Sequence, residues 1–190
     1  MWMAIVLITA MTVALVRGGS LIHLADIRMS RGYLLLVALA IQYAAVFVPE
    51  EAREWGLAMI LFSYIPILAV TTKNRKSPGM ILATTGVLMN FLVIALNSGM
   101  PVLREAVAVA AEVADPDLTS LGFKHVILDA NTALPFLADV IPFRVLGVPQ
   151  VISLGDVFLA IGFGIFLESE LRRPVGWFER SSRKKKRVKS

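Results

Sequence analysis

The chain has 190 residues, of which 57% are hydrophobic and only 17% are charged, and its net charge is +5. A soluble domain would carry about a quarter charged residues, so this composition excludes an ordinary soluble domain built around one apolar core. The absence of cysteine excludes disulfide bonds and thiolate chemistry.

The hydrophobic residues are grouped in five blocks that approach the ~20 residues a helix needs to cross a bilayer. The predicted fold is therefore all-α, a membrane protein built as a bundle of five transmembrane helices. The predicted spans are about 1–16, 33–48, 56–72, 79–97 and 151–167. They belong to one transmembrane domain, residues 1–169, which includes an outer segment at 98–150. A basic cytoplasmic tail follows at 170–190.

The first block is interpreted as a retained helix, because no basic residue precedes it and Arg17 follows it directly. A signal peptide has the opposite charge order and a cleavage site of small residues. The alternative is a four-span protein whose mature N-terminus lies near Ser20.

The distribution of Lys and Arg predicts an N-terminus outside the cytoplasm and a C-terminus inside. This orientation places six basic residues of the first and third connections, and nine near the C-terminus, on the cytoplasmic side. It leaves only Arg53, Arg104, Lys124 and Arg144 outside. Cytoplasmic loops of membrane proteins carry such an excess of Lys and Arg.

Polar residues inside the predicted spans indicate faces that contact protein, since amides in lipid need hydrogen-bond partners. Gln42 is the one strongly polar residue inside the second span. In the fourth span, Gly86, Asn90 and Asn97 are four and seven residues apart and form one stripe. We expect both faces to be packed against other helices.

An ionisable residue, Asp156, lies about one turn inside the fifth span, where it is costly in a membrane and indicates a functional site. Ser153 and Asp156 also fit a capping box, in which the side chains of both residues bind backbone N–H groups at the helix start. The two interpretations remain open together. Ala160 and Gly164 follow Asp156 at four-residue steps and would let another helix approach closely.

The outer segment is predicted to contain an interfacial helix over residues 101–114, which is too short and too charged to span. Residues 133–148 are apolar but interrupted by Pro135, Asp139 and Pro142. Such a stretch can re-enter the membrane only where protein or water satisfies its backbone.

The same segment concentrates chemically useful side chains. His125 and Asp129 have i, i+4 spacing, which on one helical turn would make a metal pair or an acid–base pair. No HExxH or CxxC motif accompanies them, so we expect no metal and no cofactor. Lys124 and Arg144 could hold an anion, or could pair with nearby acids and anchor the loop.

We predict that Asp139, Asp156 and Asn97 converge on one outward-facing polar pocket. His125 or Lys124 would lie at its rim, and Asn90 and Gln42 supply polar groups at the same level of the bundle. Two carboxyl groups so placed would need a cation, a shared proton or hydrogen-bond donors.

Several motifs are similar to those of an uncharacterised bacterial family of small multi-pass membrane proteins, a domain of unknown function. They are Asn97-x-Gly99-Met100-Pro101, Lys124-His125, Asp139-Val140-Ile141-Pro142 and Ser153-Leu154-Gly155-Asp156. The resemblance extends from Gly18 to the fifth span, and Ser98 departs from it where a second glycine is expected. It implies a topology and a location in the bacterial inner membrane, but no activity.

Three functions are compatible with these features. The first is a binding, accessory or scaffold protein whose outer pocket holds a small molecule, a lipid head group or a partner subunit. The second is an intramembrane enzyme acting on a lipid-linked substrate, with Asp139 and Asp156 as paired carboxylates and His125 as acid or base. The third is a small transporter. The expected partners are membrane lipids, with anionic head groups at the basic tail, and a second copy or another membrane subunit, but not nucleic acid.

Overall fold

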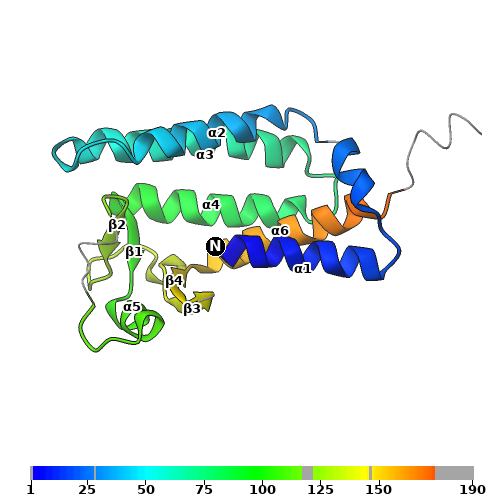
Figure 1. Cartoon of the computed structure of the whole chain (residues 1–190). Helices are drawn as coiled ribbons and strands as arrows, with labels where there is room; N and C mark the ends of the chain where they lie inside the picture. The colour runs from blue at the N-terminus through cyan, green and yellow to red at the C-terminus, as the bar shows by residue number, and fades with distance from the viewer. Residues whose placement is uncertain (1, 28, 117–121, 146, 174–190) are drawn as a thin grey trace, which may run out of the picture.

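The computed structural model describes residues 2–27, 29–116, 122–145 and 147–173, and this part of the chain is mostly helical (Figure 1). The helices are α1 (Trp2–Val16), α2 (Tyr33–Ala45), α3 (Arg53–Lys73), α4 (Met80–Asn97), α5 (Arg104–Ala111) and α6 (Leu154–Leu171). The strands are β1 (Met100–Val102), β2 (His125–Ile127), β3 (Ile141–Val145) and β4 (Val148–Ile152). Short 3₁₀ turns cover Leu21–Asp26, Glu50–Ala52 and Pro135–Leu137.

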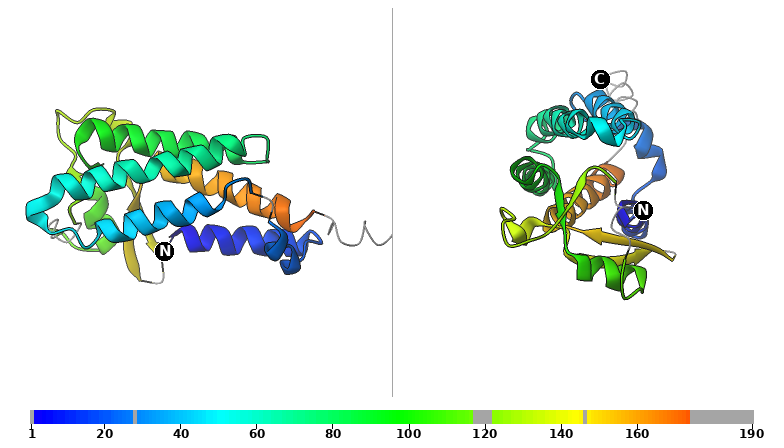
Figure 2. Two further views of the ribbon diagram at one scale, coloured as in Figure 1. Left: turned by 90° about the horizontal axis from the view of Figure 1, so that it is seen from above. Right: turned by 90° about the vertical axis from the view of Figure 1, so that its left-hand side faces the viewer.

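The long helices pack in an order that differs from their order in the chain. α2 packs on α3, α3 on α4, α4 on α6, and α6 on α1. Figure 2 shows this curved row end-on, with the α2–α3 pair on one side and α1 on the other. All of the strands and α5 lie at one end of the helices (Figure 1), so the outer segment covers that end.

The contact between α4 and α6 depends on glycines. A Cβ atom at Gly86 would lie 2.3 Å from the carbonyl oxygen of Gly155, and one at Gly162 would lie 2.4 Å from the amide nitrogen of Ala83. Only hydrogen fits at these positions, so the two helix backbones meet directly. The opposite face of α6 carries Gly164, where a Cβ atom would lie 3.6 Å from Val6 of α1. The predicted small-residue face therefore contacts α1 of the same chain.

This difference predicts unequal effects of two Gly→Ala changes in α6. At Gly155 the new methyl group would lie 2.0 Å from Oδ1 of Asn90, and such overpacking costs about 1–3 kcal/mol. At Gly164 it would make an ordinary contact, so Gly164→Ala is the matched control with the same gain in helix propensity. Thermal unfolding in detergent should show a clear loss for Gly155→Ala alone, and equal melting temperatures would contradict the packing.

Two helical stretches of the described chain, Glu50–Lys73 and Met80–Asn97, are long and apolar enough to cross a membrane. The prediction of five such helices is not supported. α1 and α2 have only 15 and 13 residues, fewer than the ~17 that set the lower limit. α6 has 18 residues but includes three carboxylates, Asp156, Glu168 and Glu170.

The strands were not predicted, and they change the outer segment. Residues 100–102 form β1 instead of the first turn of an interfacial helix, so α5 is shorter than the predicted 101–114. The described residues between 133 and 148 contain the 3₁₀ turn Pro135–Leu137, β3 and the first residue of β4 instead of a re-entrant stretch. β3 and β4 pair antiparallel from Ile141↔Ile152 to Val145↔Val148, and Gly147 has the positive φ of +81° that such a turn needs. Cross-strand pairing gives the backbone of these two strands hydrogen-bond partners within the protein.

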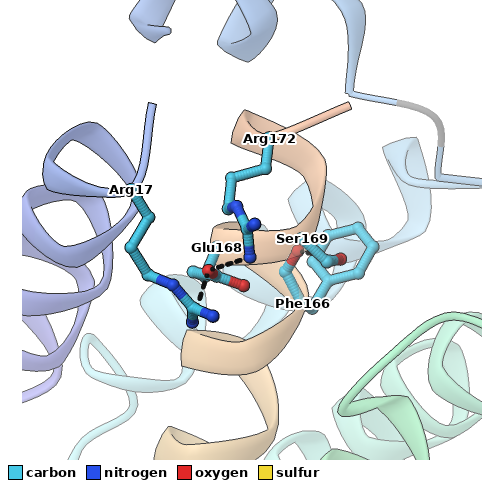
Figure 3. A network of polar contacts seen from close by, with 5 residues as sticks. All are labelled: Arg17, Phe166, Glu168, Ser169 and Arg172. Atoms are coloured by element: carbon cyan, nitrogen blue, oxygen red, sulfur yellow. Dashed lines mark hydrogen bonds and ion pairs between the residues drawn. The ribbon is translucent and has the colours of Figure 1, made fainter. Parts of the chain in front are cut away.

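The opposite end of the bundle joins the C-terminal ends of α1 and α6. Arg17 and Arg172 both contact Oε1 of Glu168, each at 3.1 Å (Figure 3). The backbone N–H of Ser20 donates to the carbonyl of Leu171 at 3.0 Å. α6 thus extends two residues past the predicted domain boundary at 169, while residues 174–190, the greater part of the predicted basic tail, lie outside the described residues.

Candidate functional site

A cavity of about 390 Å³ lies between the helices and the outer segment. Its polar lining comes from α2, α4, α6, β2, β4 and the loops beside the strands: Gln42, Asn90, Lys124, His125, Asp139, Gln150 and Asp156. The remaining wall is apolar or aromatic and belongs to α3, α4, β1, and β4 with its flanking residues. Two carboxyl groups that are 17 residues apart in sequence thus line the same cavity.

Backbone pairing fixes the position of Asp139. Its N–H donates to the carbonyl of Pro101 at 2.8 Å, and its carbonyl accepts from the N–H of Leu103 at 3.0 Å. Asp139 therefore pairs with one edge of β1, while β2 pairs in parallel with that strand at register Met100↔His125. This arrangement brings Asp139 and His125 to the cavity from two neighbours of β1.

The Asp139 side chain is buried, with 6% of the residue exposed. Its Oδ1 has no hydrogen-bond partner among the described residues, and its Oδ2 lies 3.9 Å from Nε2 of His125. Burial raises the pKa of Asp139 to about 8; the nearby charge of Asp156 adds to this rise and Lys124 opposes it. Asp139 therefore carries a proton at neutral pH, because its charged form is poorly solvated.

Asp156 caps α6 and lines the cavity at once. Its N–H donates to Oγ of Ser153 at 3.0 Å, and its Oδ2 accepts from the N–H of Ser153 at 3.2 Å, which completes the predicted capping box. Nδ2 of Asn90 donates to Oδ1 of Asp156 at 2.7 Å, and Oγ of Ser153 donates to Oδ1 of Asn90 at 2.9 Å. The three side chains form a closed ring of hydrogen bonds between α4 and α6.

Two of the predicted site residues lie away from the cavity. Asn97 holds the loop before the Pro135–Leu137 turn: its Nδ2 donates to the carbonyl of Ala133 at 2.9 Å, and its Oδ1 accepts from the N–H of Ala133 at 2.8 Å. Asp129 is exposed and accepts from the N–H of Asn131 and the hydroxyl of Thr132. Asn97 thus links the end of α4 to a distant loop, Asp129 binds within its own turn, and neither residue lines the cavity.

The predicted helical pair of His125 and Asp129 does not form, because His125 begins a strand. Successive residues in a strand rise by about 3.3 Å, so two residues four apart do not meet as they would on a helix. Among the described residues, no group of three or more His, Asp or Glu side chains is arranged to hold a metal ion.

The cationic residues of the outer segment differ in their surroundings. Lys124 is exposed and lines the cavity, as predicted for a rim residue. Arg144 forms an ion pair with Glu112, and Arg104 forms one with Asp115. Of the two expectations for Arg144, the ion pair corresponds to the second, in which Arg144 pairs with a nearby acid.

Three residues that the sequence did not single out contribute here. Tyr64 of α3 and Gln150 of β4 line the cavity. Arg53 holds the outer segment on α3, because its Nε donates to the carbonyl of Phe123 at 3.0 Å and its Nη2 to that of Ser98 at 2.8 Å. Among these three residues, only Tyr64 had a signal in the sequence: it is four residues from Ile60, which places both side chains on one face of α3.

The packing partners predicted inside the helices are found. Nε2 of Gln42 donates to Oγ of Ser63 at 3.0 Å, which links α2 to α3. Gly86 and Asn90 are buried against α6. The polar stripe of α4 therefore faces protein over Gly86 and Asn90, and its last member, Asn97, faces the loop.

Comparison with known proteins identifies a family but no activity. No curated protein and no solved structure matches the chain. The sequence model described as "Family of unknown function (DUF5317)" matches residues 26–168, which covers the helices α2 to α4, the outer segment and most of α6. Because the match spans more than half of the chain, the protein belongs to the DUF5317 family of unknown function.

Proposed function

We propose that this protein is a multi-pass integral membrane protein that binds a small ligand in a cavity facing the extracytoplasmic side. The observation that carries the proposal is the cavity of about 390 Å³, in which Asp139 and Asp156 come together with amide, imidazole and phenol groups. Ligand sites are usually cavities of this size on which a set of polar groups converges, and half of the residues that line this cavity are polar.

The exposed surface of the helices supports membrane insertion beyond the two long spans. Every long helix of the described chain exposes large apolar side chains, for example Ile8 (62%), Leu36 (69%), Phe62 (61%), Ile81 (67%) and Ile161 (50%). A soluble monomer rarely exposes apolar surface on this scale. Helices α1, α2 and α6, packed beside α3 and α4, would lie in the same bilayer and complete a five-helix bundle.

The charges at the two ends of the bundle support the proposed orientation. Arg17 and Arg172 meet at the end away from the strands, and the α3–α4 connection with Lys73, Arg75 and Lys76 joins the same end, because α3 and α4 are antiparallel neighbours (Figure 1). Under the positive-inside rule this end is cytoplasmic. The cavity then opens toward the outside.

Single cysteines test the orientation and the cavity, because the chain has no cysteine of its own. A membrane-impermeant maleimide applied to intact cells should label Lys124→Cys at the cavity rim but not Lys76→Cys at the other end. A small neutral thiol reagent, methyl methanethiosulfonate, should also react with Val151→Cys, which lines the cavity. Labelling of Lys76→Cys alone would show that the orientation is the reverse of the proposed one. An unreactive Val151→Cys in the folded protein would show that the cavity is not open.

The second candidate is an enzyme acting on a lipid-linked substrate. The observation that favours it is the approach of Oδ2 of Asp139 to Nε2 of His125, at 3.9 Å, since such a pair can transfer protons. Against it, both oxygens of Asp156 already accept hydrogen bonds from Asn90 and Ser153, which weakens Asp156 as a second base. Binding therefore accounts for more of the geometry than catalysis does.

Partners are proposed on the same grounds. The basic cluster from Arg183 to Lys189 lies outside the described residues, and its sequence next to α6 favours contact with anionic lipid head groups. Replacing these basic residues by Ser should weaken cosedimentation with anionic liposomes, and the difference should vanish in high salt. Unfolding of this variant in detergent would instead assign the cluster a structural role.

A homo-oligomer or a partner subunit would have to use the exposed apolar helix faces, because Gly164 is already packed on α1.

A further inference from the structure

The cavity is lined by two carboxyl groups, and one oxygen of Asp139 has no hydrogen-bond donor among the described residues. The Asp139 side chain is only 9% exposed. Its Oδ1 is buried and has no hydrogen-bond partner among the described residues. A buried oxygen without a donor costs about 1–3 kcal/mol. Asp156 supplies a second carboxylate to the same space, whereas Lys124, the lysine of the lining, is exposed at the rim. A donor with positive charge would satisfy both acids.

The shape and lining of the cavity favour an organic cation over a bare metal ion. The volume of about 390 Å³ is much larger than one ion, and Ile60, Ile94 and Val102 provide an apolar wall. Tyr64 adds an aromatic ring, and aromatic rings attract cations placed over their faces. A metal ion would instead need several further His or carboxylate ligands, which the described residues do not bring together.

We propose that the cavity binds a primary ammonium group between Asp139 and Asp156, with the carbon portion of the ligand against Ile60, Tyr64 and Ile94. This inference rests on the proposed binding function and names its ligand class. An ammonium group has three N–H donors and no acceptor. When the Asp139 carboxyl group rotates so that Oδ1 turns toward the cavity, the ammonium group can donate to Asp139 and to a free lone pair of Asp156 together.

When the ammonium group binds, it replaces the proton that Asp139 carries. Because Asp139 is protonated at neutral pH, the incoming ammonium displaces this proton to solvent, and the net charge of the cavity stays the same. The groups that face Asp139 from its neighbours are Tyr64, Lys124, His125 and Asp156. The affinity for ammonium should therefore rise by up to about tenfold per pH unit as the pH approaches 8.

The ammonium group can come from a free amine or from the head group of an aminophospholipid. In the second case the phosphate of the head group needs a cation, and the exposed Lys124 at the rim can supply it. Lys124→Gln separates the two sources. The change should abolish binding of a phosphatidylethanolamine head group but leave a free amine bound at least as tightly, because a like charge has been removed.

The first test compares two thiol reagents on the full-length protein in detergent. Two reaction rates are compared at each cysteine: that of the cationic 2-aminoethyl methanethiosulfonate, which carries a primary ammonium group, and that of the neutral methyl methanethiosulfonate. The ratio of the cationic to the neutral rate should be at least tenfold higher at Val151→Cys than at Val148→Cys. Val148 lies on the same hairpin, is 40% exposed and is not part of the cavity lining, so it corrects for intrinsic reactivity. The preference should fall several-fold when Asp139→Asn is added.

The second test measures protection and proton release. Butylamine should slow the reaction of Val151→Cys and release about one proton per molecule bound at pH 7, whereas butanol, which has the same carbon chain, should do neither. Asp139→Asn should lose at least tenfold in butylamine affinity and all of the proton release. Asp129→Asn, which removes an exposed acid outside the cavity, should bind as the wild type does. Nanodiscs of phosphatidylethanolamine, compared with phosphatidylcholine, test the lipid source in the same assay.

The outcomes separate this inference from the proposed function. If the neutral reagent labels Val151→Cys but charge has no effect and butylamine protects no better than butanol, the ammonium site is wrong while the open cavity remains. If the neutral reagent fails to label Val151→Cys, the binding function itself fails. Equal butylamine binding by wild type and Asp139→Asn would also overturn the assignment.

Discussion

Asp139→Asn is expected to remove most of the loss of stability that the wild-type protein undergoes between about pH 4 and pH 8. The buried carboxyl has its pKa raised from the ordinary value of 3.8 to about 8. The folded state therefore keeps a proton in this range that the unfolded state releases. Each unit by which the pKa rises on folding corresponds to about 1.4 kcal/mol, which makes this the largest single effect that the structure predicts.

The direction of the effect is opposite to that of a salt-bridged aspartate. A folded-state pKa above the unfolded value means that the full contribution of Asp139 to stability is present below pH 3.8. This contribution is lost as the pH rises toward 8, and the curve is flat above that value. Asn has the size of a protonated Asp but cannot ionise, so the variant should be more stable than the wild type at pH 8.

Thermal unfolding of the protein in detergent, measured from pH 4 to pH 9, tests this expectation. Asp129→Asn is the matched control, because Asp129 is exposed and bound only to its own turn, and its curve should follow that of the wild type. Parallel curves for the wild type and Asp139→Asn would show that Asp139 ionises normally and is not in a buried environment.

Asn90→Ala is expected to destabilise the contact between α4 and α6 by about 2–4 kcal/mol. The change removes the donor to Oδ1 of Asp156 and the acceptor for the hydroxyl of Ser153. A hydrogen bond to a charged group contributes about 1.5–3 kcal/mol, and a buried polar group left without a partner adds a further cost. The helix start of α6 loses its link to α4, although its own capping box remains.

Equilibrium unfolding in detergent can measure this loss. Thr85→Ala is a suitable control on the same helix, since the Thr85 hydroxyl donates only within α4, to the carbonyl of Ile81 at 3.0 Å, and its removal should cost well under 1 kcal/mol. Because the three side chains act as one ring, Asn90→Ala and Ser153→Ala together should cost less than the sum of the two. Strict additivity would contradict the ring.

Helix existence was predictable from the sequence, and so were several helix ends. The predicted spans 1–16 and 79–97 differ from α1 and α4 by one residue, whereas α2 ends at 45 instead of 48 and α3 begins at 53 instead of 56. The apolar blocks correctly placed the long helices α1 to α4 and α6, because hydrophobic runs of that length have few alternatives to a helix. The ends depended on backbone details: Gly18 adopts a φ of +86° after α1, and the 3₁₀ turn at Glu50–Ala52 separates α2 from α3. Both α1 and α2 remain below the length of a full span.

The strands of the outer segment were not predictable from the sequence. Its strands are only three to five residues long, and β1 pairs with β2 across an intervening helix. Such short strands carry too little periodicity to be recognised, since their stability comes from non-local pairing. The i, i+4 spacing of His125 and Asp129 was therefore assigned to the wrong element.

The convergence of Asp139 and Asp156 was predicted from proline positions and from the cost of burying acids, and both residues do line one cavity. The supporting groups were not predictable. Asn97 binds the backbone of Ala133 instead of facing the cavity. Tyr64 and Gln150 take part, although the four-residue spacing of Ile60 and Tyr64 was the only sequence signal for either of them. Which polar side chain faces a cavity depends on the rotation of each helix about its own axis.

The sequence by itself determined that this protein is mostly helical, which side chains are costly to bury, and that Ser153 and Asp156 begin a helix. These properties follow from composition and from contacts a few residues apart. Only the tertiary structure decided that β1 receives Asp139 on one edge and β2 on the other, that Asn90 closes the ring with Asp156, and that Oδ1 of Asp139 is left without a partner. Each of these depends on contacts between residues distant in the chain, whose geometry is fixed only when the helices and strands pack together.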